Sequence, residues 1–211
     1  MTHLARGPRS WREARLAALD FEATGLDVRV DHVLSYGVVP IDGGRVRLEE
    51  SLYRIVKPPI ELPPESIVVH GIRPDDVADA PELGTVADEL VDALAGRTLV
   101  AYAAWIELSF LNRFFRKTRR RWRAAIDVID LASRLAALEG APERATSRRL
   151  IDLAARHDVP PAPTHHAFGD ALTTAQLFLV LATRLERHGF VRVRDLTAAP
   201  RGWRRRRRRA A

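Results

Sequence analysis

The amino-acid sequence predicts an α/β fold in which a mixed sheet of five strands is flanked by helices. Three β-rich stretches come first, one ending near Asp20, one from Val28 to Val39 and one from Val46 to Val56. The turn Ile41-Asp42-Gly43-Gly44 joins the last two and is typical of a hairpin. From Pro74 onward, helical segments alternate with short apolar strands. An antiparallel meander followed by alternating helices and strands predicts a mixed sheet.

The later elements can be placed from the spacing of their apolar residues. Residues 98–102 and 125–128 have the short apolar runs of buried strands. The expected helices begin at Pro74 and cover about 84–94, 105–115, 131–138, 147–156 and 167–187. The last helix is the longest, and its apolar residues recur at helical spacing through Ala171, Leu172, Ala175, Phe178, Leu179 and Ala182.

Composition limits what these elements can build. At 211 residues and 46% apolar content, the chain can bury one sizeable core. The absence of cysteine excludes disulfides, zinc fingers and thiol nucleophiles, so any metal must be held by oxygen or histidine. No run of eighteen apolar residues occurs, and the start from Met1 to Arg6 lacks the apolar core of a signal peptide. A cytoplasmic protein without a membrane partner is therefore expected.

The net charge of +7 is concentrated at the end of the chain. Arg201 and the run Arg204 to Arg209 supply seven positive charges, so the rest of the chain is formally neutral. We therefore expect a polar lead-in at 1–14, one domain at 15–190, and an Arg-rich, disordered tail at 191–211. The hypothesis for the tail is that it raises nonspecific affinity for nucleic acid.

Two carboxylates lie near the end of the first strand, in Leu16-Ala17-Ala18-Leu19-Asp20-Phe21-Glu22-Ala23-Thr24-Gly25-Leu26. Alternate strand residues share a face, so Asp20 and Glu22 point the same way and Phe21 points into the opposite layer. Like charges side by side repel each other unless a cation neutralises them, and hard oxygen ligands suit Mg²⁺ or Mn²⁺. The alternative is a strand edge with two solvated acids.

Three further residues could complete a metal site. Glu107 falls in the first turn of a helix that follows a predicted strand, and Asp170 falls in the first turn of the last long helix. His165 precedes Asp170 by five residues, and an imidazole can take a proton from water near neutral pH. Each also has a simpler interpretation, as a solvated helix residue, a favourable helix-terminal charge, or a surface or capping histidine like its neighbour His166.

The ordered set of motifs resembles the DEDD family of 3′–5′ exonucleases, and the histidine subtype fits best. The motifs are Asp20-x-Glu22-x-Thr24-Gly25-Leu26, the segment from Leu99 to Leu111, and His165-x-x-x-x-Asp170. The stretch from Val69-His70-Gly71-Ile72 to Ala80-Pro81 is similar to the epsilon-like proofreading branch of the family. The likeness covers roughly Arg15 to Arg187. Either terminal motif alone would be weak, but the two together are specific.

The resemblance implies a ribonuclease H-like fold and hydrolysis of phosphodiesters with two Mg²⁺ or Mn²⁺ ions. It implies that Asp20, Glu22 and Asp170 bind the tighter ion, that Asp20 bridges to the second ion, and that Glu107 reaches the second ion through water. It also implies that His165 is the general base. The residues that it assigns to the substrate are Thr24, Gly25, Leu26, His70, Tyr102 and Trp105.

The second motif departs from the family pattern. Tyr102-Ala103 stands where the family commonly has His-Asn, and Glu107 replaces an aspartate. Glutamate is longer by one methylene, a reach of roughly 1.5 Å. We expect activity to survive this change, because a carboxylate that acts through water tolerates displacement better than a reacting group does.

The substrate class stays open at this point. DNA 3′ ends, single-stranded or frayed, are the first expectation, with a DNA polymerase as a candidate partner. An exoribonuclease of the same fold is one alternative, since the choice depends on contacts to the 2′-OH. A catalytically impaired nucleic-acid-binding module is another. The basic, aromatic region at 113–123 could bind phosphates and bases, or it could be a solvated helix end with core aromatics.

Overall fold

The computed structural model describes residues 10–117, 120–140 and 149–197, and its centre is a mixed sheet. Strand β1 (Leu16–Ala23) pairs antiparallel with β2 (Val33–Asp42) on one side and parallel with β5 (Thr98–Ala101) on the other. Strand β6 (Ala125–Asp127) runs parallel to β5 at the far edge. The predicted mixed topology and antiparallel meander are therefore confirmed.

The sheet has six strands instead of the predicted five. The stretch from Val46 to Val56 is divided into β3 (Arg45–Val46) and β4 (Leu52–Ile55) by a 3₁₀ turn at Leu48–Glu50, and both strands pair with β2. Gly43 and Gly44 form the expected hairpin turn, with φ of 61° and 69° that other residues rarely adopt. The sixth strand therefore arises because the third predicted strand is divided into β3 and β4.

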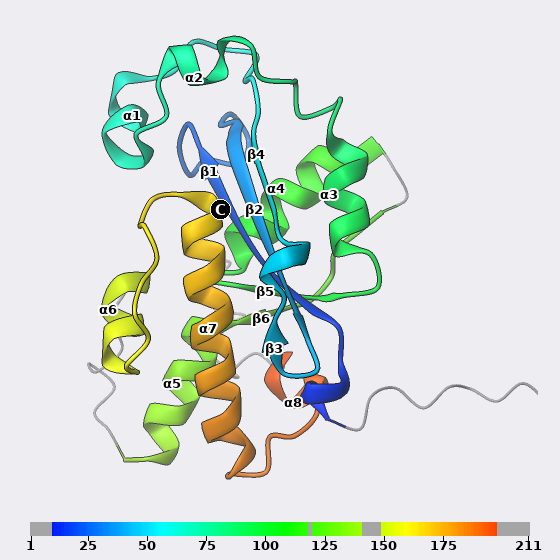
Figure 1. Ribbon diagram of the computed structural model, residues 1–211, viewed down its shortest axis with the longest axis vertical. Helices are drawn as coiled ribbons and strands as arrows, with labels where there is room; N and C mark the ends of the chain where they lie inside the picture. The colour runs from blue at the N-terminus through cyan, green and yellow to red at the C-terminus, as the bar shows by residue number, and fades with distance from the viewer. Residues whose placement is uncertain (1–9, 118–119, 141–148, 198–211) are drawn as a thin grey trace, which may run out of the picture.

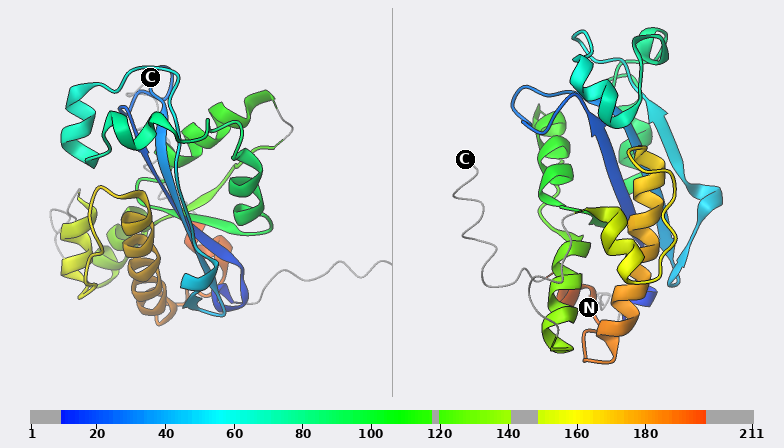
Figure 2. Two further views of the ribbon diagram at one scale, coloured as in Figure 1. Left: turned by 45° about the horizontal axis from the view of Figure 1, so that its top comes forward. Right: turned by 90° about the vertical axis from the view of Figure 1, so that its left-hand side faces the viewer.

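Eight helices are present in the part of the chain that the structure describes, and the sheet lies between two layers of them (Figure 1, Figure 2). Their bounds are α1 (Pro64–His70), α2 (Pro74–Ala78), α3 (Ala87–Leu94), α4 (Trp105–Phe114), α5 (Val128–Leu138), α6 (Leu150–Arg156), α7 (Ala167–Glu186) and α8 (Val193–Thr197). Helices α5, α6 and α7 cover one face, and α3 and α4 cover the other. The first two positions of the helix predicted at 147–156 lie outside the described residues.

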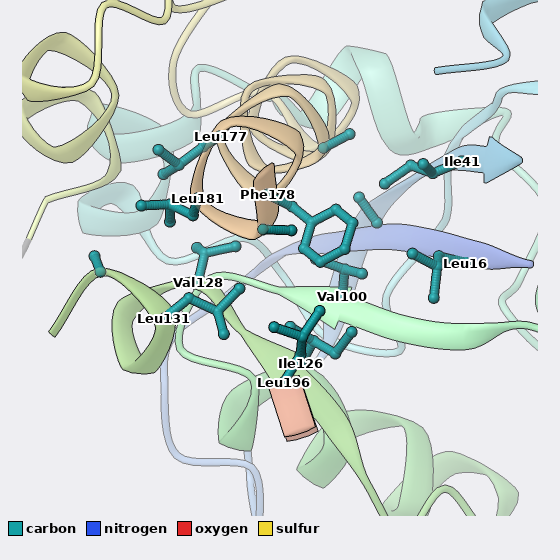
Figure 3. Close-up of a cluster of buried hydrophobic side chains, with 14 of the residues drawn as sticks. Leu16, Ile41, Val100, Ile126, Val128, Leu131, Leu177, Phe178, Leu181 and Leu196 are labelled. Atoms are coloured by element: carbon teal, nitrogen blue, oxygen red, sulfur yellow. The ribbon is translucent and has the colours of Figure 1, made fainter. Parts of the chain in front are cut away.

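The main core lies between the sheet and α7. Leu16 and Val100 from the strands contact Phe178 of α7, with Leu131 of α5 beside them (Figure 3). A second core on the opposite face packs β1 residues such as Leu19 against α3 and α4. Because β1 is buried on both faces, its apolar residues form a continuous run, which ends where the carboxylates begin.

Residues on both sides of the domain predicted at 15–190 contribute to the packed structure. Trp11 is fully buried, and its ring meets Phe178 edge-on with centroids 5.4 Å apart. Arg12 pairs with Glu186 at 2.9 Å, and Leu196 of α8 is buried in the same core. Residues 1–9 and the Arg run of the tail lie outside the described residues. Among the helices described, none is long and apolar enough to cross a membrane.

Replacing Trp11 should therefore unfold the domain more easily. We expect Trp11→Ala to lower the free energy of unfolding by about 3–5 kcal/mol, the range for large aromatic side chains lost from a core. Urea denaturation followed by far-UV circular dichroism would measure it. Leu48→Ala, at a site 55% exposed, serves as the control and should change little. Equal stability of the two variants would mean that Trp11 does not anchor α7.

Candidate active site

The first two carboxylates point toward α7 because of strand alternation. Leu16 and Ala18 of β1 pack in the core under α7, and Asp20 and Glu22 continue the same face of the strand. Phe21 points the other way and meets Phe110 of α4 at 6.2 Å between ring centroids. The predicted orientation of the pair is therefore present in the structure.

Asp170 reaches this pair because the first turn of α7 lies directly on the sheet. Gly37 of β2 is the strand partner of Asp20, and a Cβ there would lie 2.5 Å from the carbonyl carbon of Ala167. A side chain at this position would collide with the helix backbone. A Cβ at Gly169 would likewise collide with the carbonyl oxygen of Pro163. These two glycines allow the close packing that brings Asp170 to β1.

Three carboxylates converge as a result. Asp20, Glu22 and Asp170 each offer an oxygen, and these oxygens all lie within 4.8 Å of one another. The three side chains are half-buried or more, so water screens their repulsion poorly. A set of hard, charged oxygens at this separation fits a divalent cation such as Mg²⁺ or Mn²⁺.

Repulsion and burial raise the pKa of each carboxyl group. Burial raises the pKa of Asp20 well above its ordinary value, and the charges of Glu107, Glu22 and Asp170 raise it further. Burial and Asp170 raise the pKa of Glu22 to about 7. The pKa of Asp170 is raised by burial, although the backbone N–H of His165 opposes the shift. A bound cation would stabilise all three ionised forms.

Glu107 lies in the first turn of α4. It is 3% exposed, and its Oε2 atom has no hydrogen-bond partner among the described residues. After burial, the charge of Glu107 is the largest influence that raises the pKa of Asp20. Glu107 is not one of the three residues with converging oxygens. A buried carboxylate oxygen without a partner is suited to bind a cation, either directly or through a water molecule.

The two histidines before α7 have different environments. His165 is exposed, and its backbone N–H donates to Asp170 Oδ2 at 3.1 Å. His166 caps α7, where its Nδ1 accepts from the N–H of Gly169, and its ring stacks on Tyr53 with centroids 4.4 Å apart. The capping interpretation therefore holds for His166, and His165 is free to meet solvent beside Asp170.

His70 approaches the site from α1. It is 9% exposed, and its Nδ1 accepts a hydrogen bond from the N–H of Ile72 at 3.0 Å. A neutral ring with Nδ1 as acceptor carries its proton on Nε2. No acceptor for this N–H is found within the described ranges. Burial and the charge of His165 lower the pKa of His70, which favours the neutral ring with this free donor.

The predicted Thr24-Gly25-Leu26 segment forms a braced loop. Thr24 Oγ1 donates to Asp31 Oδ1 at 2.9 Å, and Asp31 Oδ2 accepts from the N–H of Asp27 at 2.7 Å. A Cβ at Gly25 would collide with the Asp31 carboxylate. The bracing leaves the Leu26 side chain 69% exposed at the end of β1.

The remaining predicted substrate residues are Tyr102, which is partly buried, and Trp105, which is exposed. Tyr102 packs against the main core, and its hydroxyl is buried without a partner in the described part of the chain. Burial, Asp127 and Asp152 raise its pKa to about 12. Trp105 is 41% exposed at the start of α4.

The region at 113–123 is mainly structural in its described part. The Arg113 guanidinium donates to the carbonyl oxygens of Val28 and Asp31 and so holds the loop before β2. Phe115 is buried and packs against Trp122 with ring centroids 5.1 Å apart. These contacts favour the interpretation as a helix end with core aromatics, while Arg119 lies outside the described residues.

Sequence reasoning missed Gly37, Gly169 and Asp127. Gly37 sits inside a strand of buried residues, where a glycine often marks a close backbone approach. Asp127 ends β6 and caps α5, accepting from the N–H groups of Ala104 and Ile129 at 2.9 Å each. An aspartate between a strand and a helix could have been predicted as a cap, but not its bond to Ala104, which is 23 residues away.

A mixed sheet with paired carboxylates on its central strand and a third on the helix packed against it defines a ribonuclease H-like nuclease. A family model for the RNase T exonucleases matches residues 17–178. The chain therefore belongs to this exonuclease family, which confirms the resemblance predicted from the motifs.

Individual relatives agree. The chain is 28% identical over 186 residues to the PolC-type DNA polymerase III of Thermotoga maritima, covering 87% of this chain and 13% of that protein. It is 25% identical over 176 residues to the 3′-5′ exonuclease DinG of Staphylococcus aureus, covering 82% of this chain and 19% of that protein. The chain thus spans a small part of these relatives.

The fold matches E. coli Exonuclease I in complex with a dT13 oligonucleotide with a TM-score of 0.71 at 17% identity. The match covers 83% of this chain and 42% of the Exonuclease I chain. This likeness confirms the predicted ribonuclease H-like fold.

A side chain at Gly37 should open the carboxylate cluster. We expect Gly37→Ala to weaken Mn²⁺ binding at least roughly tenfold, because a displacement near 1 Å can have hundredfold effects in a tightly positioned site. Calorimetric titration with Mn²⁺ would measure it. Gly84→Ala is the matched control, since a Cβ at Gly84 meets no atom within 4 Å. Normal Mn²⁺ affinity in a folded Gly37→Ala protein would contradict the role of this contact.

Stability without metal should depend on pH in a defined direction. The pKa of Glu22 rises on folding from 4.5 to about 7, so the folded state keeps a proton that the unfolded state releases between these values. The free energy of unfolding in EDTA should therefore decrease as pH rises from 4.5 to 7. Glu22→Gln should reduce this decrease, whereas Glu49→Gln at an exposed site should not. Thermal unfolding at several pH values would measure it, and a constant Tm would contradict it.

Proposed function

We propose that this protein is a metal-dependent 3′–5′ exonuclease that releases nucleoside monophosphates from the 3′ ends of single-stranded or frayed DNA. The observation that carries the proposal is the convergence of Asp20, Glu22 and Asp170 within 4.8 Å, on the chain segments that match the exonuclease family. The 3′–5′ direction is supported by the named activity of the DinG relative.

The carboxylates would hold two Mg²⁺ or Mn²⁺ ions. Asp20, Glu22 and Asp170 would bind the tighter ion, with Asp20 shared between both, and Glu107 would serve the second ion through water. When bound, such ions neutralise charge on the scissile phosphate and on the leaving 3′ oxygen. The unpartnered Oε2 of Glu107 supports the second position, because a buried carboxylate oxygen is rarely left without a donor or cation.

His165 would be the general base. It lies next to Asp170 and is exposed, so its ring can reach the attacking water and return the proton to solvent. The bond from its backbone N–H to Asp170 holds the backbone of His165 beside the carboxylates proposed to bind metal. His166 is unsuited to this role because its ring stacks on Tyr53 and caps α7.

The substrate would enter over the exposed apolar side chains around the cluster. Leu26 and the backbone of Thr24 and Gly25 would contact the terminal nucleotide, and Trp105 would stack on a base. The free Nε2–H of His70 would donate to an oxygen of the substrate. Tyr102 would contribute indirectly, by packing against the main core just before the start of α4, because its hydroxyl is buried.

The partners follow from the relatives. A PolC-type polymerase contains a segment similar to this chain, and the Exonuclease I structure holds a dT13 strand. We therefore propose DNA as the substrate, a DNA polymerase as a candidate partner and the cytoplasm as the location, with a role in replication or repair.

Cleavage of end-labelled strands tests the proposal. A 5′-labelled single-stranded DNA oligonucleotide and its RNA counterpart would be incubated with the protein in Mg²⁺, Mn²⁺ or EDTA. We expect a ladder that shortens from the 3′ end of DNA, is absent in EDTA, and falls by at least about a thousandfold in Asp20→Ala. This loss is expected because that carboxylate serves both ions.

The matched control is Asp42→Ala, a carboxylate on the far end of β2 that pairs with Arg97. Faster cleavage of the RNA strand would identify an exoribonuclease. No cleavage of either strand by folded protein would contradict the enzymatic proposal and favour a binding module.

A further inference from the structure

Asp127 is a buried carboxylate that the proposed chemistry does not use. It ends β6, is 8% exposed, and uses both oxygens as acceptors. Oδ1 accepts from the N–H of Ile129 and caps α5, and Oδ2 accepts from the N–H of Ala104, each at 2.9 Å. The same side chain therefore ties the start of α5 to the start of α4.

The bond to Ala104 holds a backbone turn that its own residues disfavour. Strand β5 ends at Ala101, and Ala103 has φ of 55°, in the left-handed region. Alanine is uncommon there, whereas asparagine adopts this conformation more readily. The hydrogen bond from the next N–H to Asp127 comes from outside the turn and therefore helps to keep it in place.

This turn decides where Glu107 lies. Ala104 is the N-cap of α4, and Glu107 follows three residues later in the first helical turn. The Glu107 side chain is long and buried, so the position of its carboxylate depends on where the helix begins.

We propose that Asp127 is a positioning residue that sets Glu107 against Asp20 by clamping the start of α4. The inference deepens the proposed function and rests on it, because the affected property is the second, Glu107-dependent metal position. Asp127 does not touch substrate or metal in this proposal, and it acts only through Glu107.

A suitable substitution at Asp127 can remove its hydrogen bond to α4 and keep its hydrogen bond to α5. Asp127→Ser keeps a good helix cap for Ile129, but its single short oxygen cannot also reach Ala104. Leu135→Ala, in the buried core of α5, controls for lost stability alone. Each change would be made in the full chain, both alone and together with Glu107→Gln.

Direct titration of Mn²⁺, by calorimetry or electron paramagnetic resonance, is the primary measurement. We expect Asp127→Ser to weaken the weaker of two Mn²⁺ sites roughly tenfold, the lower end of the effect of outer residues that orient metal ligands. On single-stranded DNA, kcat should fall by a similar factor with little change in KM. In the Glu107→Gln background, Asp127→Ser should have no further effect on either quantity.

The clamp predicts a rescue as well. Ala103→Asn should restore much of the Mn²⁺ affinity lost in Asp127→Ser, because asparagine holds the left-handed turn without outside help. Leu135→Ala should lower Tm and leave the second site unchanged.

Two results would overturn the inference. One is unchanged Mn²⁺ binding in Asp127→Ser, and the other is an equal loss with and without Glu107. Failure of the proposed function looks different, since the unmodified protein would then cleave neither strand or bind no Mn²⁺.

Discussion

The close approach of α7 to the sheet is the contact on which the rest of the site depends. Gly37 lets the backbone at Ala167 lie against β2, directly beside the strand position of Asp20. A side chain at Gly37 would push the start of α7 away from β2, and with it Asp170 away from the carboxylates of β1. The opposite end of α7 is held by Trp11 and by the Arg12–Glu186 pair, so repulsion at the first turn cannot simply push the helix away.

This arrangement explains why so much apolar packing surrounds a charged centre. Three converging carboxylates and the charge of Glu107 destabilise the metal-free fold, as the raised pKa values of Asp20 and Glu22 indicate. The offsetting free energy comes from the core along α7, where Phe178 and its neighbours are fully buried (Figure 3). Binding of a cation would remove this repulsion. The folded protein should therefore be more stable with metal than without it.

Sequence reasoning was reliable where the signal is local. Strand alternation placed Asp20 and Glu22 on one face, and the Gly43-Gly44 turn marked a hairpin. Sequence reasoning failed where a residue makes its contacts with parts of the chain that are distant in the sequence. Trp11 is a single apolar residue in a polar segment, so nothing in its neighbourhood predicts burial. Gly37 signals a close backbone approach, but its sequence neighbours do not show which element approaches it. The convergence of Asp170 with β1 could be expected only from the family resemblance, since no local pattern relates residues so far apart.

The departures in the second motif form one structural unit. Tyr102 turns its ring into the core, Ala103 takes the left-handed conformation that asparagine would accept more easily, and Glu107 extends from the helix that begins next. A left-handed alanine costs about 1–2 kcal/mol, which the bond from Ala104 to Asp127 offsets in part. The start of α4, fixed by this bond, and the length of the glutamate side chain together determine where the Glu107 carboxylate lies. Replacing Glu107 with aspartate would shorten the reach without moving the helix.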